Sequence, residues 1–434
     1  MTTTKTGSMA ILGGTVVDPS QKLEAPRDLL IENGRIAELA EPGALRGAAA
    51  QTISAKGLIV APGFIDIHVH LREPGQAHKE TIASGTAAAA AGGFTSVCAM
   101  PNTTPVNDLP AITRWMQDAE RGAVVNVFPI AAATRGSQGE KLTNYAELKR
   151  AGAVAVSDDG RPVLDDHIMR KALEMAKRLD MPLIQHAEDT RISKNNPVHE
   201  GEMAFRLGLR GQPVEGEWRL VLRDLTLARQ TEGHVHVAHV TTAHSIELIR
   251  DARKEGVPVS CEVTPHHFTF TDAELAGYDT NFKMNPPLRG ETDRAALLEA
   301  LLDGTVDCIA TDHAPHARFE KYVEFDRAAF GITGLEIAFG VACTALHHER
   351  NMPLMRLVQL FSTNPAKIVH LDGRGTLVLG AQADITIFDP KKRWTYDLAK
   401  TRSKSHNAPW DGTAMRGRVM QTIVGGNVVF KAGS

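Results

Sequence analysis

Two histidines, His68 and His70, stand two positions apart in an apolar segment and have the chemistry of metal ligands. Side chains i and i+2 of a β-strand share a face, so both imidazoles are expected to point the same way. The pair alone is weak evidence for a metal site, because His234 and His236 have the same spacing. That second pair stands at the start of its apolar segment, so we expect it to lie away from the end where ligands gather.

Four further groups follow other apolar segments: Asp158-Asp159 after residues 154–157, His186 after 182–185, His239 after 235–238 and Asp312 after 306–310. If these segments are parallel strands of a barrel, their carboxyl ends meet at one face. Clustered carboxylates repel one another and buried imidazoles need partners, and divalent cations relieve both problems. Because six ligands exceed the needs of one tetrahedral zinc, the sequence predicts two metal ions that share a bridging group.

The elements that must position these residues alternate between about residues 60 and 370. Expected strands are residues 64–69, 95–100, 124–131, 154–157, 182–185, 235–238, 258–261 and 306–310. Expected helices between them are residues 79–91, 108–121, 144–150, 165–179, 218–230, 243–254 and 292–302. Eight such units in series predict a (β/α)8 barrel. The rival, a doubly wound open sheet, usually has a glycine-rich turn after its first strand, where this chain has His-Val-His.

The two ends of the chain are β-like and differ from the middle. Residues 10–17, 28–31 and 35–39 read as strands, with an Asn33-Gly34 hairpin turn, and residues 384–388, 418–424 and 428–430 read likewise near the other end. Short strands at either end cannot bury a face alone. We therefore expect a composite β-sandwich from residues 1–60 and 372–434, beside a catalytic barrel over residues 61–371.

Composition limits the class of protein. The 434 residues are 43% hydrophobic and 23% charged, with a net charge of −3, so nothing indicates binding to nucleic acid or to an anionic membrane. No apolar stretch reaches the roughly 18 residues of a membrane span. Residues 1–8 lack the apolar core of a signal peptide. Four dispersed cysteines favour a reducing compartment, so we expect a cytoplasmic protein.

Several motifs carry a resemblance to a known family. Residues 62–75, PGFIDIHVHLREPG, resemble the opening signature of the amidohydrolase superfamily, in the form found in class I bacterial dihydroorotases. The resemblance continues through residues 100–103, 157–160, 283–289, 310–316 and 330–336. It covers nearly the whole chain. One departure is Arg327-Ala-Ala-Phe330, where members of the family often have a proline next to the phenylalanine.

The resemblance implies a (β/α)8 barrel with two Zn²⁺ per subunit and a small β-sandwich made from both ends. It assigns the ligands as follows: His68, His70 and Asp312 to one metal, His186 and His239 to the other, and Asp159 as the bridge. Many superfamily members bridge with a carboxylated lysine after the fourth strand. No lysine lies between Arg150 and Asp165, so a carboxylate must serve here. Family spacing favours Asp159, and Asp158 stays an alternative.

The activity implied by the resemblance is the reversible cyclisation of N-carbamoyl-L-aspartate to (S)-dihydroorotate, a step of pyrimidine biosynthesis. A zinc-bridging hydroxide would attack the ring amide, with Asp312 as general base and then acid. The implied substrate contacts are His70, Leu71, Arg72, Asn102, Asn285, His316, Phe330 and Gly331. The planar fork of Arg72 suits a carboxylate, although an ion pair with Glu73 or Glu80 is the simpler alternative. Turn capping is the alternative for the two asparagines.

Other functions stay open on the sequence. A hydantoinase, dihydropyrimidinase or allantoinase would share the barrel and the metals, but these usually carry the bridging lysine and lack the set of Arg72, Asn102 and His316. A metal-free dihydroorotase-like subunit could act as a scaffold for aspartate transcarbamoylase, but such relatives have lost ligands that are present here. Association with aspartate transcarbamoylase and formation of a homodimer are both open. For His266 and His267 we expect a place behind the ligands or in a loop, and for His313 a role in orienting a ligand.

Overall fold

The apolar segments in the middle of the chain form a ring of parallel strands. The computed structural model describes residues 7–433, and within them hydrogen bonds join neighbouring strands in chain order from β6 to β15. The strands are β6 (Phe64–Val69), β7 (Phe94–Ala99), β8 (Asn126–Ala132), β9 (Ala155–Ser157), β10 (Leu183–Gln185), β13 (Val235–Val237), β14 (Val259–Val263) and β15 (Cys308–Ile309). A parallel bridge between Val69 and His313 links the first strand to the segment after the last. The predicted barrel is confirmed.

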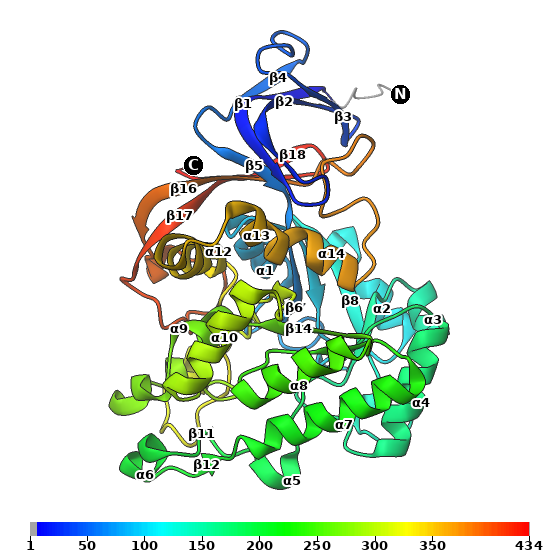
Figure 1. Cartoon of the computed structure of the whole chain (residues 1–434), viewed down its shortest axis with the longest axis vertical. Coiled ribbons are helices and arrows are strands. Elements are labelled where there is room, and N and C mark those ends of the chain that lie inside the picture. Colours follow the sequence, from blue (N-terminus) through cyan, green and yellow to red (C-terminus); the bar gives the residue numbers. More distant parts are fainter. Residues whose placement is uncertain (1–6, 434) are drawn as a thin grey trace.

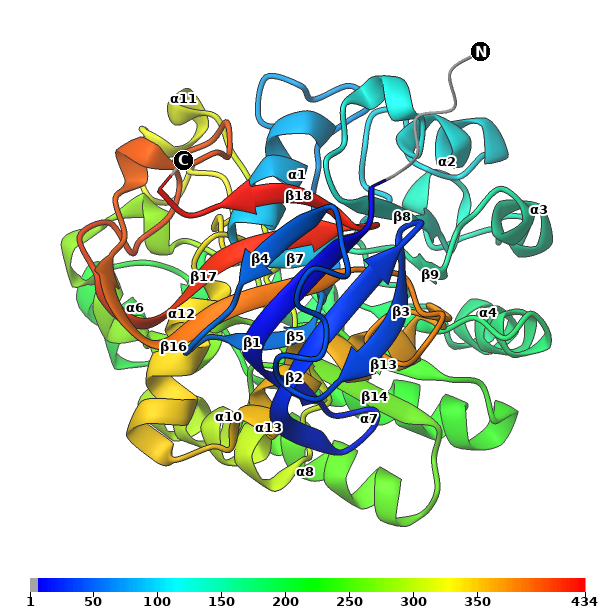
Figure 2. The same ribbon diagram turned by 90° about the horizontal axis from the view of Figure 1, so that it is seen from above.

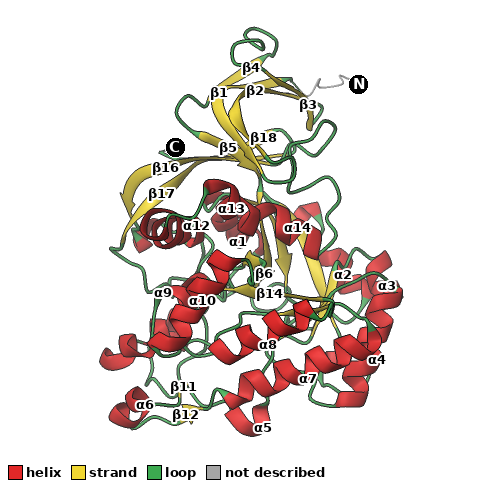
Figure 3. Cartoon of the chain, viewed as in Figure 1, coloured by secondary structure: helices red, strands yellow, loops and turns green. Residues whose placement is uncertain are grey.

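Helices pack around the outside of this ring (Figure 3). The longer ones are α1 (Ile82–Ala91), α2 (Pro110–Met116), α3 (Tyr145–Arg150), α4 (Asp166–Arg178), α7 (Glu215–Thr231), α8 (Ala243–Lys254) and α10 (Glu291–Asp303). Helix α4 shows the local cause: the Asp165 side chain accepts from the first backbone N–H groups, and residues Met169, Leu173 and Ala176 are buried at helical spacing. Because helices cover the outside and side chains fill the inside, every residue of β6 and β7 is buried.

Shorter elements lie in the loops and after the last strand. They are β11 (Val198–His199), β12 (Gly211–Gln212), α5 (Thr190–Ser193), α6 (Glu202–Leu207), α9 (Pro265–Thr269), α11 (Arg318–Lys321), α12 (Ala338–Ala342), α13 (Leu354–Val358) and α14 (Asn364–Ile368). In Figure 1, the group formed by α5, α6, β11 and β12 lies at the end of the molecule opposite the sheet made by the two chain ends.

The two chain ends share one sheet, seen from above in Figure 2. Its strands are β1 (Met9–Asp18), β2 (Leu23–Glu32), β3 (Arg35–Ala40), β4 (Gln51–Ser54), β5 (Ile59–Pro62), β16 (Ile385–Thr395), β17 (Ala414–Val424) and β18 (Asn427–Lys431). Their order is β18-β17-β16-β5-β1-β2-β3, with β4 paired to β1. Strand β5 joins the two halves, because it pairs with β1 on one side and β16 on the other.

This composite domain has its own core, which confirms the sheet expected from both termini. Met9 and Ile11 of β1 pack in one apolar cluster with Ile31 of β2 and Ile385 of β16. The predicted hairpin turn also forms, with positive φ at both Asn33 and Gly34. The polar residues 1–6 lie outside the described residues, and the division of the chain into domains at residues 60 and 372 stays a prediction.

Two further sequence expectations concern cysteines and membranes. Cys98, Cys261, Cys308 and Cys343 are all buried and unpaired, as expected of small core residues. In the described part of the chain, we find no helix with the length and apolar character needed to cross a membrane.

Candidate metal centre and active site

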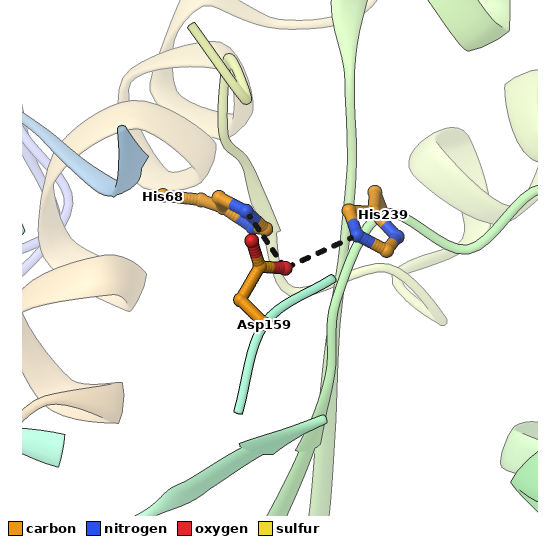
Figure 4. A group of neighbouring side chains, drawn as sticks. All are labelled: His68, Asp159 and His239. Atoms are coloured by element: carbon orange, nitrogen blue, oxygen red, sulfur yellow. Dashed lines mark ion pairs between the residues drawn. The ribbon is translucent and has the colours of Figure 1, made fainter. Parts of the chain in front are cut away.

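The register of the strands brings the predicted ligands to one level at the carboxyl end of the barrel. Ile184 of β10 pairs with Ser157 of β9. His186 and Asp159 each follow two residues later, at the carboxyl ends of these two strands. The His68 side chain, at the end of β6, points toward Asp159 from another side (Figure 4). Ligands from β6, β9 and β10 therefore converge because the carboxyl ends of all strands of one barrel meet at the same face.

The first group of ligand atoms surrounds Asp312. Its Oδ1 lies 3.0 Å from Nε2 of His70 and 3.5 Å from Nε2 of His68. All three side chains are buried, and their ligand atoms lie within 4.8 Å of one another. Such spacing leaves room for one ion among two imidazoles and a carboxylate.

The second group surrounds Asp159 and includes His68 again. Oδ1 of Asp159 lies 3.5 Å from His68 Nε2, 3.7 Å from His186 Nδ1 and 3.8 Å from His239 Nε2. Figure 4 shows this carboxylate between His68 and His239. Its other oxygen, Oδ2, lies 3.5 Å from Nε2 of His70. Asp159 thus contacts histidines of both groups, as a bridging residue would.

The neighbouring Asp158 points elsewhere. Its carboxylate accepts hydrogen bonds from the backbone N–H and the hydroxyl of Thr134, so it anchors the loop after β8. Burial raises the pKa of Asp158 to about 6. Its geometry is that of a buried structural carboxylate.

The hydrogen atoms of the imidazoles can be assigned from their partners. A carboxylate only accepts, so Nδ1 of His68 carries the proton toward Glu262 Oε1 at 2.6 Å, and Nε2 of His186 carries it toward Glu188 Oε2 at 2.9 Å. Asn102 donates its amide to Asp159, which leaves its Oδ1 to accept from Nδ1 of His70. Three rings therefore direct a lone pair toward the two aspartates.

This donor set fits a pair of divalent cations. His68 Nε2 and Asp159 Oδ1 are fully buried atoms without a hydrogen-bond partner. Nδ1 of His186 lies only 2.9 Å from Nε2 of His239. Opposing lone pairs on His70 Nε2 and Asp312 Oδ1, 3.0 Å apart, repel unless a positive charge lies between them. Buried orphaned acceptors are rare in folded proteins, and here they cluster. The buried histidines and aspartates are thus compatible with a metal site.

The electrostatics of the cluster also favour bound positive charge. Burial lowers the pKa of His68, but Asp312, Glu262 and Asp159 together hold it well above its usual range. Burial likewise opposes the charged form of His186, whose pKa rises to about 10 because Asp159 and Glu188 are close. The carboxylates therefore stabilise a positive charge, whether a proton or a metal ion, next to these ring nitrogens.

Two carboxylates that the sequence analysis missed orient the ligands. Glu262 of β14 binds His68 Nδ1, and Glu188 binds His186 Nε2. Such outer partners fix the tautomer and orientation of a metal-binding histidine. Two signals were available in the sequence. Glu262 is a charged residue directly after the apolar segment 258–261, and Glu188 stands two positions after His186.

Three residues of the site have an unusual backbone conformation. Arg72, His239 and Asp312 have φ values of 62°, 32° and 45°, a region that non-glycine residues seldom adopt. Each residue follows a barrel strand or its loop, where surrounding contacts hold it. Strain of this kind often marks functional sites.

A cavity of about 260 Å³ opens onto the cluster. Among the residues predicted to bind substrate, those that line it are His70, Arg72, Asn102, Asn285, His316 and Phe330. Leu71 and Gly331 are outside this lining. The Leu71 side chain is buried, and the Gly331 backbone N–H donates to Lys283 while its carbonyl accepts from Asn407. The structure thus gathers most of the predicted set, and the roles of all of them stay predictions.

Arg72 is a buried cation at the edge of this cavity. Its Nε donates to the Pro315 carbonyl at 3.0 Å, and Nη2 lies 3.2 Å from Nε2 of His316. Neither Glu73 nor Glu80 pairs with it among residues 7–433; Glu73 instead accepts from the backbone of α1. Burial lowers the pKa of Arg72 to about 10, so it remains charged at neutral pH. This geometry favours recognition of an anion over a surface ion pair.

The two asparagines and the extra histidines have defined contacts. Asn102 spans His70 and Asp159, and the amide of Asn285 donates to Glu188 at 2.8 Å, so both make side-chain contacts within the site. His267 lies in the short helix α9, and its ring contacts the Thr264 hydroxyl and the Pro286 carbonyl, so its role stays a prediction.

The barrel, the composite sheet and the ligand cluster together define an amidohydrolase. The L-hydantoinase (dihydropyrimidinase) from Arthrobacter aurescens has the same fold, with a TM-score of 0.87 over 98% of this chain and 96% of that chain, at 24% identity. At this level of identity the likeness concerns the fold alone.

Sequence relatives specify the family. A family model described as dihydro-orotase-like matches residues 57–245. Dihydroorotases from Solibacter usitatus and Anaeromyxobacter dehalogenans are 48% and 49% identical to this chain, over 421 and 424 residues, and in each case 97% of both chains is covered. The chain belongs to the dihydroorotase family, which confirms the resemblance drawn from its motifs.

Proposed function

We propose that this protein is a zinc-dependent dihydroorotase that interconverts N-carbamoyl-L-aspartate and (S)-dihydroorotate. The observation that carries the proposal is the buried cluster of six donor side chains in a chain about half identical to dihydroorotases: His68, His70, Asp159, His186, His239 and Asp312. We assign His68, His70 and Asp312 to one zinc, His186 and His239 to the other, and Asp159 to both.

Zinc ions bound there would lower the pKa of a coordinated water to about 7 and polarise the carbonyl of the substrate. The chain supplies the remaining parts. Glu262 and Glu188 keep two imidazoles in the tautomer that leaves a lone pair facing the cluster. Asn102 holds His70 and Asp159 in a fixed relation through its two amide atoms.

Asp312 is the residue proposed to move protons. Its carboxylate lies at the cavity and contacts His70 and His68. Burial raises the pKa of Asp312, but the nearby imidazoles of His68 and His70 outweigh burial and lower it overall, so the group starts as a base. In ring opening, Asp312 takes a proton from the attacking water as the C–O bond forms. It then gives that proton to the ring nitrogen as the C–N bond breaks.

The cavity also explains why a small anionic substrate would be selected. Its volume of about 260 Å³ suits a small ring compound. Arg72 provides hydrogen-bond donors for the substrate carboxylate, and neutral His316, whose pKa is held low by burial and by nearby Arg72, accepts a hydrogen bond that orients the guanidinium. A hydantoinase would need no such cation for an uncharged ring, so this pocket favours dihydroorotate.

The direct test is to measure whether the purified, zinc-loaded protein hydrolyses dihydroorotate, hydantoin or dihydrouracil. Bound metal is measured in parallel by mass spectrometry. We expect turnover of dihydroorotate and two zinc ions per chain. Turnover of hydantoin or dihydrouracil in its place would contradict the proposal, and absence of any turnover would favour the scaffold alternative.

A single substitution tests the carboxylate pocket. In Arg72→Met, KM for dihydroorotate should rise about 100-fold, because a charge-assisted contact is lost while the metal ligands are untouched. Zinc content should equal that of the wild type, and Arg27→Met, which removes an arginine of the distant β2, is the control. An unchanged KM would exclude Arg72 from substrate binding.

Partners and location belong to the same proposal. We propose a cytoplasmic enzyme that acts on a small-molecule substrate, with formation of a homodimer and association with aspartate transcarbamoylase as open alternatives. Sedimentation of the chain alone, and then with that enzyme, distinguishes a monomer, a dimer and a mixed complex. The domain division at residues 60 and 372 is testable by expression of residues 61–371 alone.

A further inference from the structure

Two lysines are buried in the wall next to the candidate active site. Lys283 is 2% exposed and Lys321 is 5% exposed, which is unusual for a lysine without a carboxylate partner. Lys283 begins the motif that contains Asn285, and Lys321 is the last residue of α11. Among residues 7–433, neither forms an ion pair, so their role is not charge neutralisation.

Both ammonium groups bind backbone carbonyls of one segment. Lys283 Nζ donates to the carbonyls of Phe325 and Asp326, at 2.8 and 3.0 Å. Lys321 Nζ donates to the carbonyl of Ala329 at 2.8 Å and to that of Lys283 at 3.2 Å. We call residues 325–331 the clamped segment, because these bonds hold both of its ends.

The clamped segment ends at the cavity. Phe330 lines the cavity, and Lys283 Nζ lies 4.5 Å from the centre of its ring. The backbone N–H of Gly331 donates to the carbonyl of Lys283 at 3.0 Å. The segment contains no proline, so hydrogen bonds and not a fixed φ must hold its conformation.

We infer that Lys283 and Lys321 are positioning residues that hold the clamped segment, and with it Phe330, in the conformation that binds substrate. The inference rests on the proposed function, because it assigns the clamped segment to the substrate pocket. It predicts that the lysines affect substrate affinity far more than turnover, since neither contacts the metal ligands or the reacting atoms.

The kinetic test is Lys321→Met, which keeps the apolar stem and removes the donors. We expect KM for dihydroorotate to rise about tenfold, since the Ala329 carbonyl of the clamped segment loses its partner, with kcat changed less than about threefold. Zinc content should stay at the wild-type value. Lys391→Met, which changes an exposed lysine of β16, is the matched control. A purely structural role would lower the active fraction and leave KM unchanged, and that result overturns the inference.

A second readout does not depend on activity. Arg327 is exposed within the clamped segment and is a potential trypsin site. Cleavage after Arg327 should be slow in the wild type and in Lys391→Met, and at least about tenfold faster in Lys321→Met, because cleavage follows the population of the open segment. Equal cleavage rates in all three proteins overturn the inference. If the wild type has no dihydroorotase activity but Lys321→Met is still cleaved faster than the wild type, the proposed function is rejected and the clamp is retained.

The wild-type protein offers a measurement that needs no variant. Burial lowers the pKa of Lys283 to about 8 and that of Lys321 to about 7, and the two ammonium groups also repel. The charged groups that act on them are Asp279 and Glu320 for Lys321, and Asp326 and Arg210 for Lys283. The charged clamp is therefore complete at pH 6 and weakened above pH 8. Cleavage after Arg327, relative to a free peptide of residues 321–331, should rise over that interval, and a constant ratio opposes the inference.

Discussion

The chain contains two His-X-His pairs with identical spacing and different surroundings. His68 and His70 lie at the carboxyl end of β6, where their free ring nitrogens face Asp159 and Asp312. The pair at His234 and His236 belongs to the opposite end of β13. There, one hydroxyl, Ser260 Oγ, lies 2.8 Å from His234 Nε2 and 2.7 Å from His236 Nδ1.

The difference shows what makes a histidine available to a metal. Both ring nitrogens of His236 have protein partners, because Nε2 lies 3.2 Å from Glu262 Oε2. His68 uses only Nδ1, and its Nε2 is left without a partner. Glu262 connects the two pairs, with one oxygen for each. His236 thus supports His68 through Glu262, and the ligand atoms of His236, Glu262 and Cys308 also lie within 4.8 Å of one another.

The largest predicted effect concerns Asp312, the carboxylate that contacts His68 and His70. Asp312→Asn should fold normally and lose turnover by about 1,000-fold or more, since an amide cannot accept and return the proton. Thermal unfolding and zinc content measured beside kcat separate this loss from misfolding. Activity within about tenfold of the wild type would refute the proposed role.

Replacement of one histidine in each pair tests the comparison directly. His70→Asn should lose bound zinc and reduce kcat about 100-fold or more, because it removes a proposed ligand. His234→Asn should retain both zinc ions and most of its activity. Equal zinc loss in the two variants would show that the spacing of the histidines, and not their position in the strand, determines which pair binds zinc.

The connection through Glu262 predicts a graded effect. Glu262→Gln should weaken zinc binding about 10- to 100-fold, because the carboxylate no longer fixes His68. His236→Gln should weaken it less, since its contact acts on His68 only through Glu262. Competition with a chelator measures both affinities. A larger effect of His236→Gln would mean that this ring has its own role in metal binding.

The smallest predicted effect concerns stability at the carboxyl end of β13. Buried Glu217 accepts from the backbone N–H groups of Thr241 and Thr242, at 3.1 and 2.9 Å. Burial raises its pKa, but Arg289 and these hydrogen bonds outweigh burial and lower it below the usual range. A lowered carboxyl pKa adds stability that is complete above the unfolded pKa and is lost as pH falls through the folded pKa.

The measurement is thermal unfolding of the wild type and Glu217→Gln between pH 7 and pH 3. The wild type should be more stable at neutral pH, and the difference should shrink below about pH 4, where the unfolded chain binds a proton first. The ligands are the same in both proteins, so metal release cancels in the comparison. A difference that grows toward acid pH would contradict the assigned direction.

The fold was predictable from the sequence to a large extent, because its elements are short and regular. The helix expected over residues 243–254 is observed as Ala243–Lys254, and the strand expected over 235–238 as Val235–Val237. The expected helix 108–121 instead ends at Met116 and is followed by a separate 3-10 turn. Strand β16 continues to Thr395, beyond the expected 388, through a register shift that apolar patterning does not reveal.

The site divides in the same way. Its proposed ligands were found because histidine and aspartate at strand ends are conspicuous. Glu262 and Glu188 were missed, since their function depends on partners that are not visible nearby in the sequence. No local pattern indicated that Lys283 and Lys321 are buried, and only the backbone carbonyls around their ammonium groups show their role.

The sequence by itself determined the order of strands and helices and the kinds of donor at the strand ends, because those signals depend on neighbours a few residues apart. The tertiary structure decided which nitrogen of each ring is free, which aspartate faces the histidines, and which pair of histidines has a supporting role. Those outcomes depend on contacts such as that of His68 with Glu262, 194 positions away, which exist only once the barrel has closed.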